Sequence, residues 1–144
     1  MKVASKTEYA LNTVLDLAVH GNGRVVSAAE IARRRRIPLK YLEQILSLLR
    51  EGGLVTSRRG ARGGYELAKP PDDISLEEVV RLSGDGLLSP EWTDEGRAGT
   101  EDGPFDLVWR EFEHFIRDRL RNISIEDITK HERAATRDAS HYVI

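Results

Sequence analysis

The chain has 144 residues, a length that suits one domain, or one small domain with an appendage, around a single core. It contains no cysteine, which excludes disulfides and thiolate metal ligands, and its apolar runs are too short to span a bilayer. The amino terminus lacks the apolar centre of a secretory signal, so we expect a cytoplasmic protein.

The net charge of −2 conceals a separation of charge along the chain. Residues 1–71 carry 13 Lys or Arg against 6 Asp or Glu, which gives +7. Residues 72–144 carry 9 Lys or Arg against 18 Asp or Glu, which gives −9. The amino-terminal half can therefore attract a polyanion such as nucleic acid.

The first predicted helix covers about residues 6–20. Its apolar residues recur at helical spacing until the sequence Gly-Asn-Gly stops the pattern at residues 21–23. The preceding Ser5-Lys6-Thr7-Glu8 has the form of a capping box, so we interpret Glu8 as a capping carboxylate.

Two further helices follow in close succession. Ser27 begins a second capping box, and a short helix is predicted from there to about Arg36. Pro38 suits the first turn of a third helix, because its missing N–H has no partner within the helix there. Gly52 and Gly53 end this third helix.

The third helix has two distinct sides. One side is apolar and is predicted to lie in the core; it carries Leu39, Leu42, Leu46 and Leu49. The roughly opposite side carries Lys40, Gln44 and Ser47, which have donors that can reach base edges or phosphates. This arrangement is typical of a recognition helix.

A β-hairpin is predicted directly after this helix. Residues 54–58 and 65–68 are short enough to be strands, and a glycine-rich segment connects them. Arg58, Arg59 and Arg62 place positive charge at the turn. A helix, a second helix and a basic hairpin together predict a winged helix-turn-helix and hence DNA binding.

The second half of the chain contains helices separated by an irregular segment. A third capping box at residues 75–78 opens a short helix, and we assign residues 1–83 to one DNA-binding domain. Residues 84–103 show no pattern and predict a flexible loop, in which Trp92 either anchors the loop or closes over an effector.

An aromatic stripe follows this loop and predicts a long helix. Its members are Phe105, Val108, Trp109, Phe112, Phe115, Ile116 and Leu120. One small domain does not need such a stripe, so we predict a two-fold homodimer that would present two reading heads to a palindromic site. Residues 104–130 comprise this dimerisation helix and a short helix after Ser124, and a polar tail occupies 131–144.

The order of these elements resembles the Rrf2 family of bacterial transcription regulators. The resemblance is most specific in the segment SRRGARGGYELA at residues 57–68, and the segment IPLKYLEQIL at 37–46 is similar to the family's recognition helix. The resemblance implies a mainly α-helical fold with a small β-hairpin wing and a long carboxyl-terminal dimerisation helix. It also implies a cytoplasmic, non-enzymatic, sequence-specific regulator, most simply a repressor.

The resemblance implies particular DNA contacts. Residues 40, 41 and 44 would face the major groove, the wing arginines would enter or flank the minor groove, and Glu43 lies where a relative discriminates between operators. Independently of the resemblance, the arginine run 33–36 is either a solvated helix end or a phosphate contact, and its place beside the recognition helix and the wing favours phosphate contact by some of the four. The expected DNA-binding set is Ser27, Arg33, Pro38, Lys40, Tyr41, Glu43, Gln44, Arg58, Arg59, Gly60, Arg62 and Gly63.

The expected sensor differs from that of many relatives. Those members hold an iron–sulfur cluster with three cysteines in the loop that corresponds to residues 84–103, whereas this chain has no cysteine. Glu8 and Asn12 occupy positions from which some relatives supply cluster ligands, but Glu8 alone would not hold a cluster. We therefore expect no cofactor, and a small molecule or a partner protein as the signal.

Two other classes of function fit the residues less well. A protein-interaction module that keeps the winged fold would use the acidic half and the aromatic helix to bind a partner, but it gives the +7 amino-terminal half no purpose. An enzyme needs a nucleophile with its base, or a metal cluster, and the four histidines are scattered without metal-ligand spacing.

Overall fold

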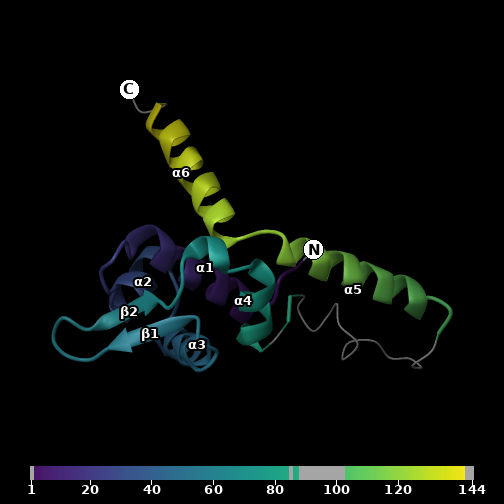
Figure 1. Cartoon of the computed structure of the whole chain (residues 1–144), viewed down its shortest axis with the longest axis horizontal. Coiled ribbons are helices and arrows are strands. Elements are labelled where there is room, and N and C mark those ends of the chain that lie inside the picture. Colours follow the sequence, from purple (N-terminus) through teal and green to yellow (C-terminus); the bar gives the residue numbers. More distant parts are fainter. Residues whose placement is uncertain (1, 85, 88–102, 142–144) are drawn as a thin grey trace.

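The computed structural model describes residues 2–84, 86–87 and 103–141, and it is mainly α-helical with a two-stranded antiparallel wing (Figure 1). The elements, in chain order, are α1 Ser5–His20, α2 Ala28–Arg35, α3 Leu39–Glu51, β1 Val55–Arg58, β2 Gly64–Leu67, the 3-10 helix η1 Pro71–Asp73, α4 Leu76–Ser83, α5 Asp106–Arg121 and α6 Ile125–His141. In the described part of the chain, no helix is long and apolar enough to cross a membrane.

The core lies between α1, α2 and α3 and extends to the first residues of β1 and α6. Every member of one apolar set has less than 2% of its surface exposed: Val14, Val26, Ile31, Leu42, Ile45, Leu46, Leu49, Leu54, Val55, Ile74 and Ile125. Burial of this aliphatic surface supplies the main stabilisation of the domain, at roughly 25 cal/mol per Å² removed from water. The helix α3 and the wing are thus fixed to a common core.

Two of the three predicted capping boxes are confirmed at their serines. The hydroxyl of Ser27 accepts a hydrogen bond from the backbone N–H of Glu30, and that of Ser75 accepts one from Glu78, each at 3.2 Å. The capping box predicted at Ser5 is wrong, because α1 begins at Ser5 itself and Ala4 is the residue before it. Ala4 is buried and its N–H donates to the carbonyl of Leu87, so a contact with a distant segment determines where α1 begins.

The last helix is longer than predicted. The sequence suggested a short helix and a polar tail from residue 131, whereas α6 runs on to His141. Ser124 and Asp127 cap its start reciprocally, and backbone hydrogen bonds of Ile123 with Leu76 and of Ile125 with Ile74 join it to the body. Further along α6, Glu132 forms an ion pair with Arg35 of α2.

The helices α5 and α6 extend away from the body in different directions (Figure 1). The carboxyl-terminal part of α5 lies against α4, and the amino-terminal part of α6 lies against α1. Most of the segment 84–103, including Trp92, lies outside the described residues, so the flexible loop predicted there stays a prediction. The division into segments 1–83, 84–103, 104–130 and 131–144 also remains a prediction.

Candidate nucleic-acid interface

The helix α3 separates a buried side from an exposed side. Leu42, Leu46 and Leu49 are buried as predicted, and Ile45 joins them. Leu39 was predicted to be core, but 46% of its surface is exposed. It occupies the first turn beside the exposed Pro38, and helical spacing alone does not tell how far the core reaches along a helix.

The opposite side of α3 is open to solvent. Its exposed side chains are Lys40, Tyr41, Glu43 and Gln44, all of which the sequence assigned to DNA. Cation, hydroxyl, carboxylate and amide groups on one helix face provide donors and acceptors for the major groove of a duplex, which is wide enough to admit a helix. This face therefore has the chemistry of a recognition helix.

A tight turn sets the orientation of α3 relative to α2. Arg36 has a left-handed backbone, with φ at 54°, and the next residue, Ile37, is buried. The N–H of Ile37 donates to the carbonyl of Ala32 at 3.1 Å, so the turn is closed by a backbone hydrogen bond. Together with the cap at Ser27, this turn places the exposed amino-terminal residues of α3 at one edge of the domain.

The wing is an antiparallel hairpin in which Val55 pairs with Leu67 and Arg58 with Gly64. Its connection requires glycine, because Gly60 has φ at +117° and a Cβ at Gly63 would lie 2.3 Å from the carbonyl oxygen of Arg58. The predicted strands at 54–58 and 65–68 are confirmed with shifts of one residue at their ends.

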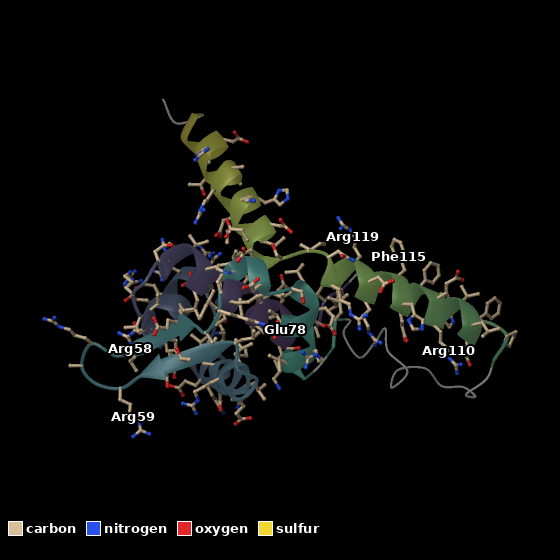
Figure 2. All side chains as sticks on the ribbon, viewed as in Figure 1. Arg58, Arg59, Glu78, Arg110, Phe115 and Arg119 are labelled. Carbon is tan, nitrogen blue, oxygen red and sulfur yellow. The ribbon has the colours of Figure 1, made fainter. Side chains whose placement is uncertain are left out.

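The arginines of the wing differ in their partners. Arg58 forms an ion pair of 3.3 Å with Glu66 on the neighbouring strand. Arg59 and Arg62 are exposed and form no ion pair with any residue in the described part of the chain. Figure 2 places Arg58 and Arg59 at the outer part of the hairpin, with Arg59 pointing away from the body. Two guanidinium groups are thus available to phosphate.

The wing is also fixed at its base. Val26, which precedes α2, and Tyr65 of β2 exchange two backbone hydrogen bonds of 2.8 Å each. A Cβ at Gly64 would lie 2.6 Å from the carbonyl oxygen of Val26, so only glycine permits this close approach. The basic turn is therefore held on a rigid support next to the start of α2.

The arginine run 33–36 is divided between two roles. Arg34 and Arg35 turn inward: Arg34 binds both carboxylate oxygens of the fully buried Asp16 at 3.1 and 2.9 Å, and Arg35 binds Asp16 at 2.9 Å. Arg35 also binds Glu132 of α6 at 2.5 Å. Of the four arginines of the run, only Arg33 and Arg36 are exposed.

These contacts keep both inward arginines charged. The hydrogen bond with Asp16 raises the pKa of Arg34 above its ordinary value, against a smaller opposing effect of burial. Burial lowers the pKa of Arg35, but hydrogen bonds to Glu132 and Asp16 outweigh it and the net shift is upward. The role of Asp16 was missed in the sequence, because a lone acid on a helix gives no sign of its partners.

A shallow depression beside α3 adds one residue to the site. It is lined by Lys6 of α1 together with Lys40, Glu43, Gln44, Ser47 and Leu48 of α3. Lys6 is thus a further cation next to the recognition face, and sequence reasoning did not single it out. The spacing within α1 gives no indication that this side of the helix faces α3.

The aromatic stripe of α5 is largely uncovered. The exposed fractions are 69% for Phe115, 55% for Phe112 and 41% for Trp109, and the rings of Trp109 and Phe112 are 6.0 Å apart. Figure 2 shows Phe115 pointing away from the body. Of the predicted stripe, Ile116 and Leu120 are half-buried and Phe105 and Val108 are exposed; Leu107, which was not predicted, adds a further exposed apolar side chain.

Comparison with known proteins identifies this arrangement. Residues 3–131 match the Rrf2 family, described as an iron-dependent transcriptional regulator. The chain belongs to the Rrf2 family. It is therefore a DNA-binding transcriptional regulator with a winged helix-turn-helix, and the family is non-enzymatic.

Individual relatives of the Rrf2 family cover most of the chain. The HTH-type transcriptional regulator IscR of Erwinia tasmaniensis is 35% identical over 133 residues, which cover 92% of this chain and 81% of the relative. IscR of Photorhabdus laumondii is 36% identical over 135 residues, with the same coverage of 92% and 81%.

Solved structures of the family share the fold. The structure of T. potens IscR superimposes with a TM-score of 0.76 at 32% identity and covers 94% of this chain and 90% of its own. CymR, the global cysteine regulator of B. subtilis, gives 0.73 at 28% identity and covers 91% and 98%. The predicted mainly helical fold with a hairpin wing is confirmed.

The iron implied by the family description does not fit the residues present. The chain has no cysteine, and the part that the structure describes contains no group of three or more His, Asp or Glu residues that could hold a metal ion. The side chain of Asn12 donates to the backbone carbonyl of Glu8 at 3.0 Å on the same helix. Glu8 and Asn12 therefore do not form part of a wider ligand set in the described residues.

Proposed function

We propose that this Rrf2 protein binds operator DNA sequence-specifically as a two-fold homodimer and represses transcription by occluding a promoter. In this proposal Lys40, Tyr41 and Gln44 read bases, with Glu43 and Pro38 beside them on the same edge. Arg59 and Arg62 bind phosphate or the minor groove, and Gly60 and Gly63 let the wing backbone approach the duplex closely.

The observation that supports this function best is the exposure of reading residues on a buried, rigid support. The core side of α3 is fully buried while its outer side is exposed, and the wing arginines Arg59 and Arg62 are exposed on the same domain. Positioning of this kind reduces the conformational entropy that binding must overcome. Ser27, Arg33 and Lys6 are further candidate phosphate contacts, and Lys6 lines the depression beside α3.

The homodimer is supported by the exposed stripe of α5. A contiguous set of large apolar side chains rimmed by charge is a common mark of a protein interface. A second copy of the same helix would cover the stripe symmetrically, and a two-fold dimer would match a palindromic operator.

The proposed signal is a small molecule or a partner protein, and not an iron–sulfur cluster. Iron–sulfur clusters are held mainly by cysteine thiolates, and this chain has no cysteine. Any such signal must bind the two states of the dimer unequally in order to change DNA affinity.

The experiment that tests this function selects genomic fragments with the purified protein and measures affinity for the enriched sites across a salt series. Arg59→Ala should weaken binding to all duplexes and reduce the slope of log K against log salt by about 0.9 for each phosphate that is no longer neutralised. Gln44→Ala should instead erode the preference for the operator by roughly 1–3 kcal/mol. Arg81→Ala, at an exposed position on α4 that belongs to neither the proposed DNA contacts nor the proposed dimer interface, is the charge-matched control.

The results separate this function from its alternative. If no genomic site is enriched, the chain is a protein-interaction module that has kept a winged fold. If sites are enriched but both variants bind like the wild type, DNA is bound through other residues. Repression is tested by transcription in vitro from an enriched promoter, where added protein should reduce the transcript.

A further inference from the structure

A cleft between α1, α2 and α6 is unused by the proposed DNA contacts. Its volume is about 470 Å³, and it is lined by Val19, His20, Arg34, Arg35, Glu132, Arg133, Thr136 and Arg137. That volume lies within the range of roughly 300–1,000 Å³ found for small-molecule sites. Figure 1 shows α6 projecting from the side of the body opposite to α3, so a duplex bound by α3 would not fill this cleft.

The cleft has more positive than negative charge. Arg34 and Arg35 are held in place by the buried Asp16 and by Glu132, and their positions are fixed by these carboxylates. Arg133 and Arg137 also line the cleft, are exposed and have no ion pair with any residue of the described ranges. These two guanidinium groups can bind an added anion without breaking the existing network.

The spacing of the two unpaired arginines indicates the size of the anion. Arg133 and Arg137 are one turn apart on α6, which corresponds to about 6 Å along a helix axis. Planar guanidinium groups match the geometry of carboxylate and phosphate, and two of them at this spacing suit two anionic groups within one small molecule. Val19 adds an apolar side chain to the lining of the cleft.

We propose that this cleft binds a small organic anion that carries two carboxylate or phosphate groups. The ligand contacts Arg133 and Arg137 of α6 and lies over the guanidinium groups of Arg34 and Arg35 on α2. It therefore joins α6 to the helix that directly precedes the recognition helix.

Binding at this cleft would also bias the reading head, a consequence that rests on the proposed function. Arg35 is separated from α3 only by the turn at residues 36–38. An anion that bridges Arg133 and Arg137 of α6 to Arg34 and Arg35 restricts the movement of α2 relative to α6 and α1, because the same guanidiniums hold Asp16 of α1. DNA affinity would then change with ligand concentration.

The binding step is tested by isothermal titration of the full chain at low ionic strength with succinate, with inorganic pyrophosphate and with acetate as a singly charged comparison. Succinate or pyrophosphate should bind saturably with one site per chain, and acetate should not. Whichever of the two binds distinguishes a carboxylate site from a phosphate site. Absence of saturable binding by both would overturn the proposal.

A double variant locates the site. Arg133→Gln/Arg137→Gln should lower the affinity by roughly 100-fold, because each of the two charge-assisted hydrogen bonds is worth about one decade in the binding constant. Arg81→Gln/Arg121→Gln changes the net charge equally at exposed positions outside the cleft and should keep wild-type affinity. Equal losses in both double variants would show nonspecific attraction of an adventitious ion only and would refute the site.

The regulatory consequence has its own measurement. Operator affinity is measured with and without the anion that binds, for the wild type and for Arg133→Gln/Arg137→Gln. If the anion changes the operator affinity of the wild type but not that of the double variant, anion binding and DNA binding are coupled through this cleft. If the anion binds but no operator is bound, the proposed function is wrong and the anion site stands. If an operator is bound but no anion binds, the anion site is wrong and the proposed function stands.

Discussion

Replacement of Asp16 by asparagine should destabilise the domain strongly. Asp16 is fully buried on α1, and its two carboxylate oxygens accept three hydrogen bonds from Arg34 and Arg35 at 2.9–3.1 Å. Asparagine has nearly the same shape, but it carries no charge and presents an NH₂ group where one oxygen was. That NH₂ group would face a guanidinium, which also only donates.

The expected cost follows from counting these bonds. The bond from the Nη2 of Arg34 is broken, which costs about 1.5–3 kcal/mol for a hydrogen bond to a charged group. The two bonds that remain on the other oxygen no longer have a charged acceptor and weaken by about half. Arg34 and Arg35, which are partly buried, also lose the anion that they share. We therefore expect the free energy of unfolding to fall by about 3 kcal/mol in total, as for other broken buried ion pairs.

The matched comparison is Glu132→Gln. Glu132 is the second acidic partner of Arg35, but 33% of its side chain is exposed, and water replaces much of the interaction that the substitution removes. We therefore expect at most about 1 kcal/mol from this change. The difference between the two variants isolates the effect of burial.

The assay is urea denaturation followed by circular dichroism, with thermal unfolding in parallel. Asp16→Asn should lower the free energy of unfolding by about 3 kcal/mol at an unchanged m-value and lower the midpoint by roughly 10 °C. If Asp16→Asn lowers the free energy of unfolding no more than Glu132→Gln does, the ion pairs of the buried Asp16 do not hold α1 and α2 together. The reasoning would then be wrong.

Three further results are expected. Gly64→Ala should destabilise the protein by about 1–3 kcal/mol in urea denaturation, because its Cβ would lie 2.6 Å from the carbonyl oxygen of Val26; full stability would contradict that close approach. Phe115→Glu should convert a dimer into a monomer in sedimentation velocity while circular dichroism stays unchanged, since 69% of Phe115 is exposed within one chain. Hydrogen bonds from Ser124 lower the pKa of Asp127, so its stabilisation of α6 is present above the pKa of the unfolded chain and is lost as pH falls through the lower folded value. An NMR titration should place the midpoint of Asp127 below that of an unstructured aspartate, and a midpoint at or above it would refute the cap.

Local signals in the sequence identified most elements because neighbouring residues decide them. The serine caps at Ser27 and Ser75 formed as predicted, since each hydroxyl bonds an N–H only three residues away. The glycine-rich wing formed for the same reason, because its turn depends on the conformational freedom of Gly60. The exposed position of Gln44 follows from helical spacing once Leu42 and Leu46 are buried.

The errors arose where distant segments meet. Ser5 has the sequence form of a cap, but the hydrogen bond between Ala4 and Leu87 starts α1 earlier. The end of α6 looked like a polar tail, yet Glu132 binds an arginine 97 residues earlier in the chain.

Sequence alone thus determined the exposed polar side of α3, the wing and the absence of thiolate ligands, because residue type and short-range spacing fix these features. Tertiary structure alone decided the division of the arginine run. Arg33 and Arg36 are exposed while Arg34 and Arg35 turn inward, and only packing against α1 and α6 places Asp16 and Glu132 beside them. Electrostatic attraction acts through space, so adjacent arginines of identical chemistry acquire different roles from their distance to a carboxylate.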